Sequence, residues 1–333
     1  MLIDADGNVE GSVTGGCVEG ALVQEAQLVL AGEGPRVRTY GISDDVAAGV
    51  GLMCGGTVHV FVERLEGEAA EALDQVLAAA LEGKPAAVAT LLDGDSAGRR
   101  MYSLDGLTHG SMEVTPLLDR TVAREMHGML VKGMTALRHY GADGAAMGSE
   151  LRVHIHAFAE PPKLVIIGAI DFSAATAALA SQLGYEVTIV DAREPFLRSQ
   201  RFSDYADVVV DWPDRFFAGR EYGPRDAILI FSHDPKFDEP ALISALRSGA
   251  GYVGALGSRR THEKRVERLR EAGLEDSEIE RIAAPCGLDI GARTPAETAV
   301  SILAEVIALQ NARSAERLVE TEGPIHAERE RVS

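Results

Sequence analysis

The chain is poor in cysteine and aromatic residues, and it has no long apolar run. Its 333 residues include three cysteines, Cys17, Cys54 and Cys286, and so odd and sparse a set excludes a disulfide framework. No CxxC pair occurs, which argues against a structural zinc site. No stretch of about 18 apolar residues is present, so no membrane span is expected. The N-terminus, MLIDADGNVEG, lacks the basic and apolar regions of a signal peptide, and these absences together predict a cytoplasmic protein.

Basic residues are scarce as well. The chain carries 32 lysines and arginines against 51 aspartates and glutamates, a formal net charge of −19. A surface this acidic repels nucleic acid and anionic membranes, so neither is an expected partner, although a local basic site is compatible with it.

Four segments differ in their residue patterns. Residues 1–65 are rich in glycine, and the apolar spacing over Val18–Leu30 predicts one helix among short strands. Residues 66–160 mix helix and strand signals, residues 161–310 alternate strands with helices, and residues 311–333 form a charged tail that we expect to be disordered. Repeated strand–helix units predict a parallel doubly wound sheet. The expected fold class is therefore α/β, with a Rossmann-like C-terminal domain and a smaller, apparently truncated α+β domain before it.

Specific elements can be assigned within this outline. Strands are expected at Thr57–Val62, Ala86–Leu92, Arg152–Phe158, Leu164–Ile167, Glu186–Val190, Asp207–Val210, Ala227–Phe231 and Tyr252–Ala255, with two more around turns in Met101–Leu118. Helices are expected at Gly67–Leu81, Ala174–Gln182, Pro240–Arg247, Arg259–Glu271 and Pro295–Gln310. Thr294, Pro295 and Glu297 give the last helix a capping box with proline at its first position.

Two cysteines stand beside paired glycines. Gly15 and Gly16 precede Cys17, and Gly55 and Gly56 follow Cys54. Glycine lets the backbone turn sharply and approach a ligand, and Cys17 falls near a helix N-terminus, where a thiolate or another anion is favoured. The two thiols could converge on a soft ligand such as a transition metal. Small buried cysteines at tight turns explain the same pattern.

The turn after the strand Leu164–Ile167 has the position of a Rossmann phosphate loop, but its sequence departs from one. The glycine pattern GxGxxG would place glycines at 168, 170 and 173, whereas Ile170 and Ser173 stand at the last two positions. Asp171 adds negative charge where a phosphate would bind. Asp191 ends the next strand, where a ribose-binding acid is expected. We therefore expect a Rossmann scaffold with a degenerate nucleotide site, and NAD(P) binding is disfavoured.

Three further groups follow the strands of this domain and are expected at the carboxyl edge of the sheet, where ligands bind in such folds. One is the acid–base candidate His233, for which a loop-ordering hydrogen bond is the alternative. A phosphate cradle, or alternatively a solvated basic helix face, is formed by Gly257, Ser258, Arg259 and Arg260. The loop Pro285–Pro295 carries Asp289 between glycines and Arg293 near a helix start.

These motifs together resemble the XdhC/CoxI family. The N-terminal strings are GSVTGGCVEG, YGISDD and GLMCGGTVHVFVE, and the C-terminal strings are VDAREPF, FSHDPKFD, GALGSRR and GLDIGARTPAETAVSILAEVIA. The resemblance covers most of residues 7–65 and 161–310. It implies an accessory chaperone, more a maturation factor than an enzyme. Such a protein binds molybdenum cofactor, assists its sulfuration by a cysteine desulfurase and delivers it to a molybdenum hydroxylase of the xanthine dehydrogenase or CO dehydrogenase type.

The resemblance also assigns residues. Cys17 and Cys54 match the family's cysteine motifs and are candidate metal ligands, and the Gly257–Arg260 turn is a candidate for the pterin phosphate. A homodimer is compatible with the family. Two departures stand out: relatives usually carry sequence before the position of Met1, so we expect a truncated N-terminal domain, and many have Gly-Ala-Gly-His where this chain has Gly168 to Asp171. An NAD(P)-dependent oxidoreductase and a pure protein–protein adaptor are the alternative functions.

Overall fold

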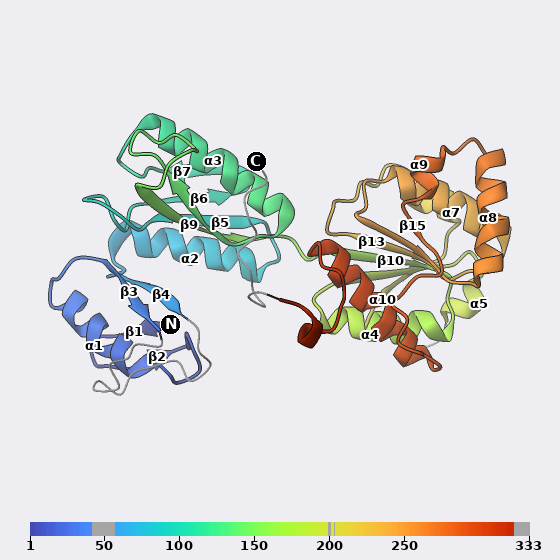
Figure 1. The fold of residues 1–333 in the computed structure, drawn as a ribbon, viewed down its shortest axis with the longest axis horizontal. Coiled ribbons are helices and arrows are strands. Elements are labelled where there is room, and N and C mark those ends of the chain that lie inside the picture. Colours follow the sequence, from blue (N-terminus) through green and yellow to red (C-terminus); the bar gives the residue numbers. More distant parts are fainter. Residues whose placement is uncertain (42–56, 199–200, 203, 323–333) are drawn as a thin grey trace. The chain divides into compact units, whose positions relative to one another are not determined.

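The computed structural model describes residues 1–41, 57–198, 201–202 and 204–322. The chain forms two compact units, an N-terminal unit, Met1–Glu160, and a C-terminal unit, Pro161–Ser333 (Figure 1). Cys54, Gly55 and Gly56 lie outside the described residues.

The first part of the N-terminal unit is built from two small antiparallel pairs and one helix. Strand β1 (Leu2–Ile3) pairs with β2 (Val9–Glu10), and Asp4 closes the turn between them by accepting the N–H of Asn8 at 2.8 Å. Helix α1 (Glu19–Leu30) buries Leu22, Ala26 and Val29 at helical spacing. Strands β3 (Arg36–Tyr40) and β4 (Val58–Val62) form the second pair.

A five-stranded antiparallel sheet makes up the rest of this unit. Its strand order is β7-β6-β5-β9-β8. The strands are β5 (Ala86–Leu91), β6 (Arg100–Leu104), β7 (Leu107–Gly110), β8 (Ala136–Tyr140) and β9 (Leu151–Phe158). Helix α3 (Pro116–Lys132) covers one face through Leu118, Val122 and Met126, and α2 (Gly67–Leu81) lies on the other (Figure 1).

The C-terminal unit holds a six-stranded, fully parallel sheet of order β12-β11-β10-β13-β14-β15. The strands are β10 (Lys163–Ile167), β11 (Glu186–Val190), β12 (Asp207–Val209), β13 (Ala227–Ile230), β14 (Tyr252–Ala255) and β15 (Ile282–Ala283). This is the strand order of dinucleotide-binding folds, which reverses direction between β10 and β13. The Rossmann-like expectation is confirmed.

Helices cover both faces of this sheet (Figure 1). On one face α4 (Asp171–Gln182) and α10 (Pro295–Gln310) pack over strand residues such as Ile166 and Leu229. The other face carries α6 (Pro213–Phe217), α7 (Pro235–Arg247), α8 (Arg259–Glu271) and α9 (Asp276–Ile279). The short elements α5 (Glu194–Leu197) and η2 (Leu318–Glu320) complete the unit. None of the described helices is long and apolar enough to cross a membrane.

Several expectations need correction. Helix α3, strand β3 and strand β8 were not predicted. The segment expected to hold two strands around turns, Met101–Leu118, ends in the first residues of α3 instead. Helix α7 begins at Pro235 rather than Pro240, so Pro240 lies inside its first turns. Pro240 is the sixth residue of α7, beyond the residues whose N–H groups lack an intrahelical acceptor, so the helix loses the hydrogen bond that another residue there would donate to the Lys236 carbonyl.

Candidate functional site

The loop before α1 encloses a carboxylate of the chain itself. The Glu19 carboxylate accepts backbone N–H groups of Val13, Thr14, Gly15, Gly16 and Val18 at 2.7–3.1 Å, together with the hydroxyls of Ser12 and Thr14. The pKa of Glu19 is held well below its usual range, first by the N–H of Thr14 and then by the Ser12 hydroxyl. Gly15 and Gly16 have φ values of +75° and +119°, which only glycine adopts without strain.

This arrangement changes the expectation for the Cys17 loop. The N–H groups of Gly15 and Gly16, expected to be open to an anion, already donate to Glu19. Cys17 is a free, half-buried thiol two residues before α1. Among the described residues no group of three or more His, Cys, Asp or Glu side chains is arranged to hold a metal. The pairing of Cys17 with Cys54 stays a prediction, because Cys54 lies outside the described range.

Replacing Glu19 with glutamine is expected to raise the alkylation rate of Cys17 about five-fold, because charge-assisted hydrogen bonds that order the loop become neutral ones. The measurement is iodoacetamide labelling in a background where Cys54 and Cys286 are serine. Glu68→Gln is the matched control, since Glu68 is also a first-turn acid but sits on α2. An unchanged rate in Glu19→Gln would contradict a structural role for this carboxylate.

The remaining candidates lie at the carboxyl edge of the parallel sheet. Gly168 begins the turn that follows β10. Its φ is +109°, and its N–H donates to the Val190 carbonyl at 2.8 Å. Asp171 does not cap α4: Arg201 pairs with its carboxylate, and the Ser173 hydroxyl donates to the Gly168 carbonyl. The turn is therefore satisfied by the chain's own groups.

Asp191 has a partner too. Its buried carboxylate accepts the N–H of Ala169 at 2.9 Å and two guanidinium nitrogens of Arg193 at 2.8 and 2.9 Å. Although burial opposes it, the Arg193 guanidinium and the backbone donors lower the pKa of Asp191. A ribose diol would have to displace these bonds, which agrees with the expected degenerate nucleotide site.

Helix α8 begins with the predicted cradle. Ser258 is its N-cap, with the Thr261 N–H donating to Ser258 Oγ at 3.1 Å. Arg259 and Arg260 are exposed, and the first turn of α8 has no acidic residue. By contrast, α4, α7 and α10, the other helices of more than eight residues in the described part of this unit, each carry an acid in the first turn. The α8 N-terminus therefore favours an anion most strongly.

A buried ion pair lies next to this turn. Arg265 is 1 % exposed, and its Nη2 donates to Asp238 Oδ2 at 3.2 Å and to the Leu256 carbonyl at 3.1 Å. Its Nε and Nη1 are buried without a hydrogen-bond partner. Burial raises the pKa of Asp238, against the effect of the Ser232 hydroxyl and Arg265. The buried positive charge of Arg265 therefore lies beside the cradle, with its Nη2 3.9 Å from where a Cβ of residue 257 would be.

The other predicted residues are exposed at the same edge. His233 follows β13, and Asp289 and Arg293 lie in the loop before α10, where the Arg293 N–H donates to Glu297 Oε2 at 2.7 Å. Cys286 lies inward in that loop, and burial raises the pKa of its thiol to about 12. Such a thiol stays protonated at neutral pH and is a poor metal ligand in this state.

A row of rings and one guanidinium extends across the ends of β11 and β12. Trp212 and Phe237 stack with centroids 4.6 Å apart and planes at 18°. The Arg193 guanidinium carbon lies 5.8 Å from the Phe237 centroid and 4.3 Å from that of Phe196. We call these four residues the aromatic ladder. Its Phe237 and Arg193 also line a small pocket with Gly168, Asp191, Pro213 and Ser232.

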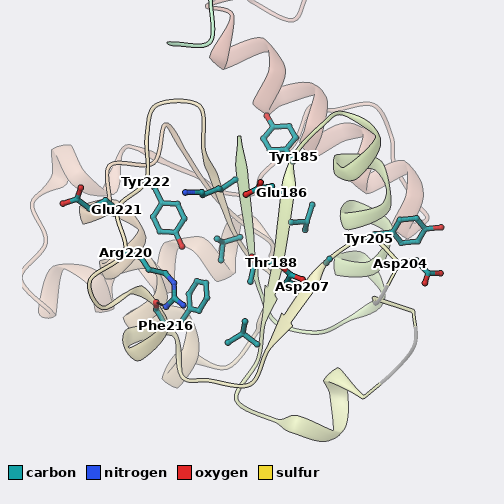
Figure 2. Close-up of a pocket in the computed structure, with 15 residues that line it drawn as sticks. Tyr185, Glu186, Thr188, Asp204, Tyr205, Asp207, Phe216, Arg220, Glu221 and Tyr222 are labelled. Carbon is teal, nitrogen blue, oxygen red and sulfur yellow. Dashed lines mark hydrogen bonds between the residues drawn. The ribbon is translucent and has the colours of Figure 1, made fainter. Parts of the chain in front are cut away.

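A larger hollow of about 840 Å³ lies at the opposite end of the strands (Figure 2). It covers the amino-terminal halves of β10 and β11, including Glu186 and Thr188, while Phe216, Arg220 and Tyr222 form another side. Helix α6, with five residues, is too short to cover this part of the sheet. The hollow contains none of the predicted residues and lies away from the edge where such folds bind ligands, so we place the site at the carboxyl edge.

Sequence patterns missed Arg265 and the aromatic ladder. The pair Arg265–Asp238 joins residues 27 apart, and the Trp212–Phe237 stack joins the N-cap residue of α6 to α7. The helix α8 has several arginines, and the pattern of charged residues does not indicate which of them is buried. The one available signal was helical spacing, which puts Arg265 on the same face as Leu269.

Comparison with known proteins gives consistent relatives. Over 311 residues the chain is 26 % identical to a Bacillus subtilis (strain 168) protein named as a probable xanthine dehydrogenase subunit, covering 92 % of this chain and 86 % of that protein. It is 27 % identical to the molybdenum cofactor insertion chaperone PaoD of Escherichia coli (strain K12), covering 93 % and 77 % respectively. A crystal structure described as a xanthine dehydrogenase from Bacillus halodurans shares the fold, with TM-score 0.65 and 24 % identity over 96 % of this chain and 87 % of that one.

Two family profiles match separate regions. The profile of the XdhC and CoxI family matches residues 1–41, and that of the XdhC Rossmann domain matches residues 164–306. Both ends of the chain thus carry the same family's signature, and the order of the two regions is the one expected from the motifs. The chain therefore belongs to the XdhC/CoxI family.

Proposed function

We propose that this chain is a cytoplasmic chaperone that binds molybdenum cofactor, assists its sulfuration and delivers it to a molybdenum hydroxylase. The proposal includes a cysteine desulfurase and the apo-hydroxylase as partners, and a homodimer as the assembly. Its main support is a relative over 93 % of the chain that is named a molybdenum cofactor insertion chaperone. We call the molybdenum cofactor the cargo. The N-terminus of α8, which has no acidic residue in its first turn, is the structural observation that agrees with a cargo carrying a phosphate.

The cargo's anionic end fits the carboxyl edge. Ser258, Arg259 and Arg260 would hold the phosphate, because a helix N-terminus with two exposed guanidinium groups favours a dianion. Gly257, with φ +137°, brings the backbone close to that position without a side chain. His233, Asp289 and Arg293 are proposed to contact the rest of the cargo.

The thiols have a separate role in this proposal. Thiolate sulfur is a preferred ligand of soft metals, so Cys17 and Cys54 are proposed to contact the molybdenum end of the cargo. When bound, the cargo supplies a molybdenum centre that can carry a terminal sulfido ligand. The Glu19-ordered loop would fix the backbone around Cys17 and limit how far the thiol can move.

Coexpression tests the function. The hydroxylase is purified from cells with and without this chain, and its molybdenum and labile sulfide are measured. We expect molybdenum or sulfide to fall in its absence. Normal contents of both would contradict the proposal. Normal maturation with Cys17, Cys54 and Arg259 all replaced would instead favour the adaptor alternative.

Removal of one charge at the cradle gives a sharper prediction. Arg259→Ala is expected to weaken cofactor binding about 10- to 30-fold, since a charge-assisted hydrogen bond to phosphate is lost. Lys264→Ala is the matched control, because Lys264 is an exposed cation in the middle of the same helix. Equal effects of the two changes would indicate only a general loss of positive charge.

The oxidoreductase alternative is tested by NADH titration with melting temperature as the readout, since a ligand of the native state raises it. Because Asp191 is paired with Arg193 and Ala169, we expect no shift at micromolar NADH. Submicromolar binding would reverse the order of the two functions.

A further inference from the structure

The aromatic ladder of Phe196, Arg193, Phe237 and Trp212 is partly exposed. Trp212 is 41 % and Phe196 47 % exposed, although both are large apolar side chains. The stacked pair Trp212–Phe237 has nearly parallel planes, and parallel rings with an open outer face can accept another flat ring. Arg193 is held in place by two bonds to Asp191, so its guanidinium plane is fixed beside the rings.

The ladder lies beside the point where the strand order reverses. Its residues follow β11 and β12 or begin α7 after β13, and the pocket beside it is lined by Gly168, Asp191 and Ser232 from the ends of β10, β11 and β13. Open α/β sheets bind their ligands in this crevice. The ladder is therefore on the ligand side of the sheet and on the same edge as the α8 cradle.

We propose that the ladder binds a planar fused-ring nitrogen heterocycle, the pterin of the cargo. This proposal rests on the proposed function. Stacking on aromatic faces and on a guanidinium recognises the flat π-surface of such a ring. A purine nucleotide offers the same flat surface, but its ribose would need the Asp191 carboxylate, which already accepts three N–H donors from Arg193 and one from Ala169. The pterin ring needs no such acid.

Calorimetric titration of the full chain tests this assignment. The probe is pterin-6-carboxylate, with AMP as the nucleotide arm. Trp212→Leu and Phe237→Leu are each expected to weaken pterin binding about 10-fold, whereas Trp212→Phe, which keeps a ring for stacking, is expected to change it less than about three-fold. Melting temperatures of all variants identify any that fail to fold. Trp212 is the sole tryptophan of the chain, so its fluorescence in the unmodified protein should also be quenched by the probe.

Each result decides the question. Pterin binding that depends on the ring at position 212 supports the proposal. No pterin binding at millimolar concentration, or binding that Trp212→Leu leaves unchanged in a folded protein, overturns it. Tighter binding of AMP than of pterin overturns the pterin assignment. The titration uses neither molybdenum nor hydroxylase. A failure of the ladder is therefore distinct from a failure of the proposed function, which the coexpression experiment measures.

Discussion

Replacing Asp238 with leucine is expected to lower the free energy of unfolding by about 3 kcal/mol, because the Arg265 guanidinium would remain buried without its counter-ion. The side chains of the pair are 1 % and 5 % exposed, so solvent screens them little. We place the effect at the lower end of the usual range, about 3–5 kcal/mol, because the burial of Asp238 is itself unfavourable. Urea unfolding followed by Trp212 fluorescence reports on the unit that contains the pair.

The double variant Asp238→Leu with Arg265→Met is the control for this prediction. Buried ion pairs are often replaced by apolar residues of similar volume at little cost, so the double variant is expected to lie within about 1 kcal/mol of the unmodified protein. Additive losses in the two single variants would show that packing, not charge, dominates at this position.

The pH dependence follows from the raised pKa of Asp238. The folded state binds a proton at this group more tightly than the unfolded state does. Its contribution to stability is therefore greatest below the ordinary carboxyl pKa and is lost as the pH rises through the raised value. Arg265→Met removes a charge that favours the carboxylate form of Asp238. The fall in unfolding free energy with rising pH should therefore become steeper in Arg265→Met, and the part of it due to Asp238 should vanish in Asp238→Leu.

Replacing Gly168 with valine is expected to cost about 2–4 kcal/mol. Its φ of +109° is unfavourable for any side chain, and a Cβ there would lie 2.9 Å from the backbone nitrogen of Ser232. That nitrogen donates to the Ile167 carbonyl at 3.1 Å, beside the Phe231 N–H at 2.8 Å, so relief of the overlap would weaken the link between the ends of β10 and β13.

Gly184→Val separates the two causes. Gly184 also has a positive φ, +84°, but no atom lies within 4 Å of an added Cβ. We expect about 1–2 kcal/mol there, from backbone strain alone. The same urea experiment measures both variants. Equal losses at Gly168 and Gly184 would contradict the close approach of β13 to the turn.

The periodic part of the fold was predictable from the sequence, and the exceptions have physical causes. Strands β10, β11, β13 and β14 are short apolar runs separated by amphipathic helices, a pattern that few folds other than a parallel sheet explain. Helix α3 also carries its signals, with Thr115 as N-cap, Pro116 at the first position and Gly133 at the C-terminus, but neighbouring β-rich residues obscure them. The short strands β3 and β8 are stabilised by pairing with β4 and β9, and local sequence does not identify these partners.

The candidate site divides in the same way. Gly257, Ser258 and Arg259 are contiguous, and a turn followed by a capped helix places them together by local rules alone. Arg265 with Asp238, and Trp212 with Phe237, depend on how α6, α7 and α8 pack, which no local rule determines. The hydrogen bonds from Gly15 and Gly16 to Glu19 are also local. The sequence alone, however, did not show whether the N–H groups of this loop bind an external anion or a carboxylate of the chain itself.

The lengths of the outer strands have a consequence for how this chain meets other proteins. The two edges of the parallel sheet are β12 and β15, with three and two residues, against four or five in the strands between them. Asp207 and Asp211 flank the valines of β12 with like charges. Edge strands this short expose few unpaired backbone N–H and C=O groups, and the aspartates repel a second strand of the same kind. Both features disfavour edge-to-edge pairing and the aggregation that follows from it. A homodimer through the C-terminal unit would therefore have to be built from side-chain surfaces, not from a sheet continued across two molecules.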